Sequence, residues 1–304
     1  MQDKPLVSVI MNCYNSDEFL QDAIDSVLSQ TYDNFEIIFW DNMSTDNSAS
    51  IVKSYNDKRI KYFYAPRFTP LYCARNYAMQ KANGEFVTFL DCDDLWCKDK
   101  LEKQVKIMLE SKCGLCYTNY YELGVNGMVK AFVKRQPSGE ILSYQIKDYS
   151  IGILTVMISK HAWDSMEDKF DQDYNFSGDY DFFIRFLFKQ RACYINEPLA
   201  FYRISNTNSI SNQKKFENLQ ELQKCIKKLK LFFMNKNTIQ ALDIFKTKVD
   251  LKTIFYHVRH KDFYSIFIIL RNMDVLNIFS YSVILWIVSK GIKKIQNLRF
   301  LCAG

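Results

Sequence analysis

The chain has 304 residues, 48% of them hydrophobic, which is enough to bury a full core and excludes a disordered protein. Its nine glycines and five prolines are few for this length and argue against a loop-rich or all-β chain. The net charge of +6 comes from the region after residue 213, which holds 17 Lys+Arg and 6 Asp+Glu. This basic region contains no nucleic-acid-binding motif, so no nucleic-acid partner is expected.

The first 120 residues alternate between short apolar runs and amphipathic segments. Apolar runs predict strands at residues 6–11, 35–40, 60–64, 86–90 and 115–118. The segments between them predict helices at 18–30, 46–55, 71–82 and 99–109, the second with Ser44 as N-cap and the third ended by Gly84. Apolar strands that alternate with helices indicate an α/β fold with a Rossmann-like, mostly parallel sheet covered on both faces.

The remaining chain divides near residue 212. Before it, the less regular region 125–202 predicts strands at 129–133, 155–158 and 192–195 and a helix at 180–188. After it, apolar residues recur every three or four positions and predict helices, at Phe216, Leu219, Leu222, Ile226 and Leu229. The change in charge and pattern therefore predicts two regions, 1–211 and a basic, apolar helical tail at 212–304.

The tail contains two strongly apolar runs, at 266–270 and 276–288. The second is too short to span a bilayer, which needs about 20 residues. It is followed by a basic cluster at Lys290, Lys293, Lys294 and Arg299. This pattern is typical of a helix that lies in the membrane interface, and a helix packed onto the rest of the protein fits it equally well.

The nine cysteines and the start of the chain bear on the cellular compartment. Residues 1–5 are polar and lead directly into the first apolar run, so no signal peptide is expected. An odd number of cysteines then predicts free thiols in a reducing cytosol. Cys113 and Cys116 form one Cys-x-x-Cys pair without a second pair at zinc-site spacing, and are interpreted as packing residues, as are His257 and His260.

Polar clusters follow three of the predicted strands, at residues 12–15, 41–46 and 91–94. Ligands of such sheets bind beyond the carboxyl ends of the strands, where these clusters meet. Asp91, Asp93 and Asp94 repel one another unless a cation or hydrogen bonds neutralise them, and oxygen ligands favour Mg²⁺ or Mn²⁺. An acidic turn that caps the next helix is the alternative.

Three further positions allow a functional and a structural interpretation. Asp41 and Asn42 suit hydrogen bonds to a base or ribose, or ordinary turn chemistry. Arg75 suits a phosphate group or a surface ion pair. Asp179, which follows Gly178, suits a general base or a helix N-terminal charge.

In order and spacing, these segments resemble the family 2 glycosyltransferases with the GT-A fold. The resemblance covers about residues 5–210 and rests on VSVIMNCYN at 7–15, SVLSQTY at 26–32, FEII at 35–38, DNMSTDNS at 41–48, ARN at 74–76, GEF at 84–86, LDCDD at 90–94, GDYD at 178–181 and YR at 202–203. It implies an inverting glycosyltransferase with a nucleotide-binding half at about 1–120 and an acceptor half at about 121–211.

The resemblance also implies a role for each candidate residue. Asp179 would be the general base that deprotonates the acceptor hydroxyl, and Asp93 would bind the Mn²⁺ or Mg²⁺ ion that bridges the donor diphosphate. The nucleotide-sugar donor would contact Asn12, Tyr14 and Asn15 at the base, Asp41 and Asn42 at the base and ribose, Arg75, and Asp91 at the ribose or sugar.

Two departures from the family pattern concern the donor and the metal. Asn42 occupies a position where the family often has a second Asp that can pair with uracil. An amide can still hydrogen-bond a base, although it offers a different set of donors and acceptors, and UDP remains the default nucleotide. Ser205 occupies a position where some members have a histidine that contacts the metal or phosphate.

The resemblance further implies a glycan or lipid-linked acceptor, in cell-surface polysaccharide, lipooligosaccharide or other glycan biosynthesis. A peripheral protein at the inner face of the plasma membrane is expected, with membrane contact through the tail. A non-catalytic nucleotide-sugar-binding or scaffold protein on the same fold is the main alternative. A nucleotidyltransferase is disfavoured because residues 12–16 contain no glycine-rich phosphate loop.

Overall fold

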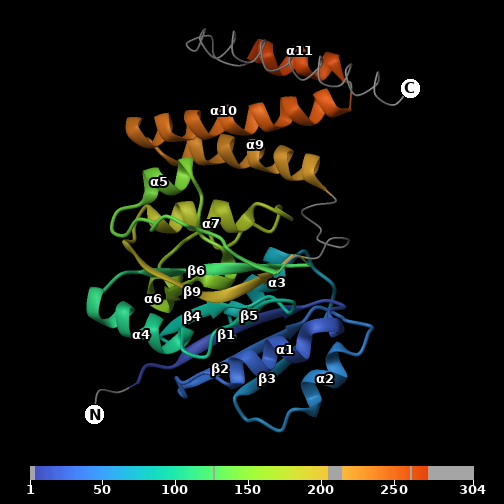
Figure 1. The fold of residues 1–304 in the computed structure, drawn as a ribbon, viewed down its shortest axis with the longest axis vertical. Coiled ribbons are helices and arrows are strands. Elements are labelled where there is room, and N and C mark those ends of the chain that lie inside the picture. The colour runs from blue at the N-terminus through green and yellow to red at the C-terminus, as the bar shows by residue number, and fades with distance from the viewer. Residues whose placement is uncertain (1–3, 126, 205–213, 261, 273–304) are drawn as a thin grey trace.

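Figure 1 shows a curled sheet flanked by helices, with the last helices of the chain stacked at one end. The structure is a computed structural model and describes residues 4–125, 127–204, 214–260 and 262–272. Its strands are β1 Val7–Cys13, β2 Phe35–Asp41, β3 Ile60–Tyr64, β4 Phe86–Phe89, β5 Leu95–Trp96, β6 Leu115–Gly124, β7 Gly127–Lys130, β8 Met157–Ser159 and β9 Ala192–Arg203. Its helices are α1 Asp17–Leu28, α2 Ser48–Ser54, α3 Leu71–Met79, α4 Lys100–Ser111, α5 Leu142–Lys147, the 3₁₀ turn η1 Ile153–Thr155, α6 Lys160–Asp164, α7 Gly178–Leu187, α9 Lys215–Phe232, α10 Lys236–Arg259 and α11 Phe263–Asn272.

The sheet is parallel in its first half and mixed in its second. Its order is β3-β2-β1-β4-β8-β6-β9-β5, with β7 paired to β6. The strands from β3 to β4 are parallel, β8 is antiparallel to both of its neighbours, and β6 and β9 are parallel to each other. The prediction of a parallel sheet therefore holds for the half that carries the three polar clusters.

Successive residues of β2 contribute to two cores on opposite faces of the sheet. Ile38 belongs to a cluster with side chains of α3 and α7, whereas Ile37 and Phe39 belong to a cluster with side chains of α1 and α4. All residues of β2 are buried, as expected for a strand covered on both faces. The predicted α/β sheet with helices on both faces is confirmed.

All strands and helices predicted in the first 120 residues are present, but the predicted cap of α2 is wrong. The helix begins at Ser48, whose N–H donates to Asp46 Oδ1 at 3.0 Å. Ser44 instead accepts the backbone N–H of Asn15 at 3.1 Å, so it joins two loops and caps no helix. The strand predicted at 192–195 continues to Arg203, and the short elements β5, α5 and α6 had no periodicity that would predict them.

The expectation of free thiols is wrong for one pair of cysteines. Cys113 and Cys193 form a disulfide across 80 residues of sequence. Cys113 lies two residues before the start of β6, Cys193 lies in β9, and these strands are paired with Leu115 opposite Ala192. The pairing of β6 with β9 therefore brings together two cysteines whose spacing in the sequence did not predict a disulfide. The other cysteines of the described residues are free, at positions 13, 73, 92, 97, 116 and 225.

The described helices of the tail pack on the rest of the protein. In Figure 1, α9 lies above α7, α10 lies above α9 and α5, and α11 follows α10. Cys225 and Leu229 of α9 are fully buried in the same core cluster as α7. No helix in the described part of the chain is both long and apolar enough to cross a membrane. The apolar run at 276–288 and the basic cluster from Lys290 to Arg299 lie outside the described residues.

Candidate active site

The carboxyl ends of β1, β2 and β4 meet at one edge of the sheet. Cys13 is opposite Asp41 in the pairing of β1 with β2. The thiol of Cys92, which follows β4, donates to the backbone carbonyl of Asn12 at 3.3 Å. The three polar clusters predicted from the sequence are therefore adjacent in space.

Asp41 and Asn42 use their side chains within the protein. Buried Asp41 accepts the Ser44 N–H at 2.7 Å through Oδ1 and the Tyr62 hydroxyl at 2.6 Å through Oδ2. Asn42 Nδ2 donates to the Thr69 carbonyl at 2.7 Å, and its Oδ1 accepts the Thr69 N–H at 3.3 Å. In this structure both residues shape the loops around the site, and two of the residues that engage them, Tyr62 and Thr69, were not singled out from the sequence.

The loop after β1 presents an exposed aromatic pair and a buried amide without a partner. The rings of Tyr14 and Phe68 are 4.7 Å apart at 59°, and both side chains are about half exposed. Asn15 has a left-handed backbone (φ 48°), and its Oδ1 accepts the Thr45 N–H at 2.8 Å. Asn12 Nδ2 is buried, and no described residue accepts a hydrogen bond from it. Phe68 follows β3 in a loop with no pattern that would have identified it.

The three carboxylates that follow β4 have different surroundings. Asp91 Oδ1 accepts Arg75 Nη2 at 2.8 Å. Asp94 is buried and accepts the backbone N–H of Arg203 at 2.9 Å, and burial followed by the charges of Asp93 and Asp91 raises the pKa of Asp94. No described residue donates a hydrogen bond to the Asp93 side chain. Although Asp93 is exposed, surrounding protein atoms and then the Asp91 charge raise the pKa of its carboxyl group to about 6.

Asp179 lies in the first turn of α7, against Tyr72 of α3. The Tyr72 hydroxyl is 3.3 Å from Asp179 Oδ1 and 3.2 Å from the carbonyl of Phe176. Gly178 is required here, because a Cβ at this position would lie 2.6 Å from the Tyr72 ring. Burial raises the pKa of Asp179, and the positive charge of Arg75 partly offsets that effect.

Tyr72 and Arg75 connect Asp179 with the acidic turn. Burial raises the pKa of Tyr72, and the carboxylate of Asp179 raises it further. The guanidinium of Arg75 is 5.3 Å from the Tyr72 ring centre and is bonded to Asp91. Residues from α3, the turn after β4 and α7 therefore surround one place at the edge of the sheet. Tyr72 was not predicted, although it precedes Arg75 by three residues and shares its helix face.

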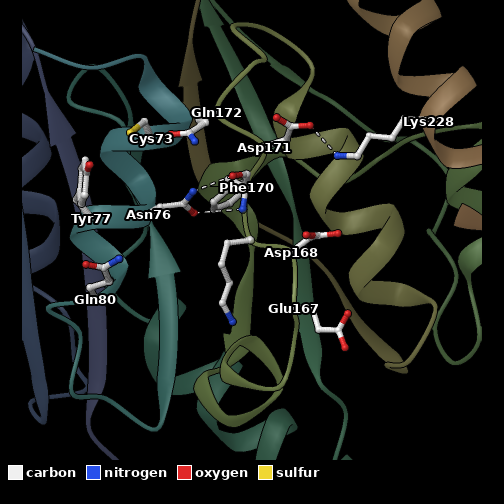
Figure 2. Close-up of a pocket in the computed structure, with 11 residues that line it drawn as sticks. Cys73, Asn76, Tyr77, Gln80, Glu167, Asp168, Phe170, Asp171, Gln172 and Lys228 are labelled. Carbon is white, nitrogen blue, oxygen red and sulfur yellow. Dashed lines mark hydrogen bonds and ion pairs between the residues drawn. The ribbon is translucent and has the colours of Figure 1, made fainter.

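A separate cavity of about 490 Å³ lies beside α3, and none of the predicted site residues lines it. Figure 2 shows the residues that line this cavity. Asn76 bonds both the carbonyl and the N–H of Phe170 across it, at 2.7 and 3.2 Å. Asp171 pairs with Lys228 at 2.7 Å. These lining groups already have partners within the protein, so the strand ends remain the better candidate for chemistry.

The residues at the strand ends fit a divalent ion that is shared with a substrate. The described residues contain no group of three His, Cys, Asp or Glu side chains that could hold a metal ion. Mg²⁺ and similar ions commonly use only one or two carboxylates and complete their coordination with substrate phosphates and water. Asp93, whose side chain receives no hydrogen bond from described residues, suits such a site.

The chain matches known glycosyltransferases in sequence. The model of the family described as "Glycosyl transferase family 2" matches residues 8–163. TuaG of Bacillus subtilis (strain 168), whose name assigns it to teichuronic acid biosynthesis, is 36% identical over 214 residues, which are 69% of this chain and 83% of that protein. The Escherichia coli UDP-Glc:alpha-D-GlcNAc-diphosphoundecaprenol beta-1,3-glucosyltransferase WfgD is 33% identical over 222 residues, 72% of this chain and 84% of that protein.

Solved structures share the fold at low sequence identity. S. aureus TarS 1-349 in complex with UDP-GlcNAc has a TM-score of 0.61 at 20% identity, over 84% of this chain and 72% of that one. The mannosyltransferase PcManGT from Pyrobaculum calidifontis, in complex with GDP-Man and Mn²⁺, has a TM-score of 0.62 at 16% identity, with the same coverage.

Proposed function

The chain belongs to glycosyltransferase family 2 and has the GT-A fold, and we propose that it is an inverting, metal-dependent enzyme with a lipid-linked or glycan acceptor. As a member of that family it transfers a sugar from a nucleotide-sugar donor, for which we propose UDP as the nucleotide. The observation that carries the proposal is the contact of Tyr72 with Asp179 beside the Arg75–Asp91 ion pair. These contacts connect Asp179, the proposed base, with the turn after β4 that carries Asp93, the proposed metal ligand.

The donor nucleotide is proposed to bind at the ends of β1 and β2. Tyr14 and Phe68 offer exposed aromatic faces on which a base can stack, and the amide of Asn12 can donate to a base or ribose oxygen. Asn15, Asp41 and Asn42, whose side chains also hold the surrounding loops in place, complete the proposed set of donor contacts at the base and ribose. UDP is the default because the solved TarS complex contains UDP-GlcNAc and the WfgD donor is UDP-Glc.

The metal ion is proposed to be Mn²⁺ or Mg²⁺, held by Asp93 and the donor diphosphate. The Mn²⁺ in the PcManGT complex supports this assignment. A bound ion would stabilise the negative charge that develops on the leaving diphosphate. Arg75 and Asp91 flank the same place, where Arg75 adds a fixed positive charge and Asp91 can accept hydrogen bonds from the ribose or sugar.

Asp179 is proposed to act as general base. Its carboxylate would remove the proton of the acceptor hydroxyl, whose oxygen then forms a bond to the anomeric carbon as the bond to the diphosphate oxygen breaks. A single displacement inverts the anomeric configuration. The raised pKa of Asp179 brings its basicity closer to neutral pH, where a general base is most effective.

A non-catalytic nucleotide-sugar-binding protein remains the alternative. A protein that only binds the nucleotide sugar needs neither a buried carboxylate to act as base nor an exposed carboxylate to bind a metal ion. The chain has both, in Asp179 and Asp93, which favours an enzyme.

A donor panel tests the proposed function directly. The purified protein, a lipid-linked glycan acceptor mixture and each of a set of UDP-, GDP- and dTDP-sugars are incubated and assayed for nucleotide release, with Mn²⁺ or with EDTA. We expect release from a UDP-sugar that depends on acceptor and is lost in EDTA. Binding of the UDP-sugar without release under any condition would support the non-catalytic alternative.

The acceptor is proposed to be presented at the cytosolic face of a membrane. The name of WfgD specifies a diphosphoundecaprenol-linked acceptor, which supports this for a relative 33% identical to the chain. The tail from residue 212 is proposed to contact that membrane. The end of α9 and the turn to α10 expose Leu231, Phe232 and Met234 between Lys230 and Lys236, a combination that suits an anionic lipid surface.

Removing these apolar side chains is expected to weaken membrane binding. The triple variant Leu231→Ser, Phe232→Ser and Met234→Ser should sediment at least several-fold less with vesicles of anionic phospholipid, because the inserted apolar area supplies the affinity. A matched triple variant at Met128, Val129 and Val133, which are exposed near the β6–β7 hairpin, is the control. Loss of sedimentation only in the control variant would place the membrane contact at the hairpin and contradict a contact through the tail.

A further inference from the structure

One carboxylate from the tail holds the segment that leads into the helix of Asp179. Glu221 of α9 accepts three consecutive backbone N–H groups, from Asn175 at 2.7 Å, Phe176 at 2.8 Å and Ser177 at 3.0 Å. Hydrogen bonds to an ionised acceptor are about twice as strong as neutral ones. Three of them on successive residues fix the path of the backbone directly before Gly178 and Asp179.

Two other residues on the same face of α9 bond to the same region. Asn218 Oδ1 accepts the Ser177 hydroxyl at 3.1 Å. Lys228 pairs with Asp171 at 2.7 Å and with buried Asp181 of α7 at 3.2 Å. Positions 218, 221 and 228 are separated by three and seven residues, which places them on one stripe of the helix. This stripe joins the tail to both ends of the segment 171–181.

The segment held by Glu221 also positions the partner of Asp179. The N–H of Phe176 bonds to Glu221, while the carbonyl of Phe176 accepts the Tyr72 hydroxyl at 3.2 Å. The same hydroxyl is 3.3 Å from Asp179 Oδ1. The Tyr72 hydroxyl therefore lies between the Phe176 carbonyl and the Asp179 carboxylate and shares its one proton between them. A series of contacts thus connects Glu221 to Asp179 through the Phe176 backbone and Tyr72.

We propose that Glu221 is a positioning residue for the reaction, which holds Asp179 at the place where the acceptor hydroxyl must lose its proton. The inference rests on the proposed function, because it concerns the proposed base. The inference also gives the tail a part in catalysis, although Glu221 lies outside residues 8–163, the part of the chain that matches the family model.

The variant Glu221→Gln tests the inference. The glutamine NH₂ group would face backbone N–H donors, so at least one of the three bonds is lost. We expect kcat to fall about 10- to 100-fold with an unchanged donor KM, because a small displacement of a catalytic group is enough for such a loss. Glu217→Gln is the matched control, since Glu217 is an exposed residue of the same helix, and it should retain the wild-type kcat.

A double variant distinguishes positioning of Asp179 from a general structural effect. If Glu221 acts through Asp179, then Asp179→Asn combined with Glu221→Gln transfers sugar no more slowly than Asp179→Asn alone. A further 10-fold loss in the double variant would show that Glu221 acts independently of the base, and would overturn the inference.

Two further outcomes separate this inference from the proposed function. A wild-type kcat in Glu221→Gln together with a slow Asp179→Asn would overturn the positioning role alone. A wild-type rate in Asp179→Asn would show that Asp179 is not the base and would overturn both the positioning role and the proposed mechanism.

If Glu221→Gln does not fold, Asn218→Ala, which loses only the bond to Ser177, is measured in its place. It should show a reduction of about 2- to 5-fold in kcat at unchanged donor KM, and an unchanged kcat would overturn the inference.

Discussion

Replacing Asp179 with asparagine is expected to slow sugar transfer about 100-fold or more while donor binding is retained, the usual range for loss of a positioned general base. Asparagine has almost the same shape and can still accept the Tyr72 hydroxyl through Oδ1, so the hydrogen bonds around α7 should survive. Its amide cannot take a proton from the acceptor. The measurement is the initial rate of transfer, alongside the dissociation constant of the donor by titration calorimetry.

The pH dependence of the rate provides a second readout for the same variant. A base acts in its deprotonated form, so the wild-type rate should fall as the pH drops through the raised pKa of Asp179, and the variant should lack that limb. Asp173→Asn is the control, because Asp173 is an exposed carboxylate of the loop before α7. A wild-type rate in Asp179→Asn would identify Asp179 as a helix N-terminal charge, favoured by the dipole of α7.

Replacing Asp93 with alanine is expected to abolish the stimulation of turnover by Mn²⁺, with a loss of about 100-fold or more in the presence of the ion. Stabilisation of a leaving diphosphate by a metal ion is worth several kcal/mol, and each factor of ten costs about 1.4 kcal/mol. No described residue donates a hydrogen bond to the Asp93 side chain, so the substitution should leave the fold intact. Turnover is measured over a Mn²⁺ titration, with thermal unfolding as the check on folding.

Protonation of Asp93 should compete with the metal. Its pKa is raised to about 6 by the surrounding protein atoms and the Asp91 charge, so the apparent affinity for Mn²⁺ should weaken as the pH falls below that value. Asp33→Ala removes an exposed carboxylate paired with Lys4 before β2 and should keep the full response to Mn²⁺. If Asp93→Ala keeps that response as well, Asp93 is not the metal ligand.

The sequence predicted the parts of the fold that are encoded locally. Apolar runs such as Ile37–Ile38 in β2 and the amphipathic pattern of α1 identify their elements from neighbouring residues alone. The polar clusters could be placed at one edge because the carboxyl ends of parallel strands coincide. The family resemblance then identified the fold, which the family model and the solved relatives confirm.

The contacts between distant segments could not be predicted. The side chains of Asp41 and Asn42, which are proposed to contact the donor, also bond to Tyr62 and Thr69, more than 20 residues away in sequence. The disulfide of Cys113 with Cys193 depends on strand pairing across 80 residues. Such contacts are set by tertiary packing, which leaves no periodic signal in the chain.

The tail illustrates the same limit. Its charge and helical pattern separate it from residues 1–211, and its sequence contains no motif of the family. Glu221 nevertheless bonds to the backbone before Asp179, because α9 packs across α7. A glutamate in a basic helix gives no indication of this contact until the fold is known.

The anomeric configuration of the product tests most directly whether one base and one bound donor carry out a single displacement. The wild-type enzyme is supplied with the UDP-sugar identified in the donor panel, in which the sugar is α-linked, and the linkage formed in the first product is read from its anomeric proton coupling by NMR. The proposed mechanism predicts a β-linked product. An α-linked product would require retention of configuration and would contradict the role proposed for Asp179.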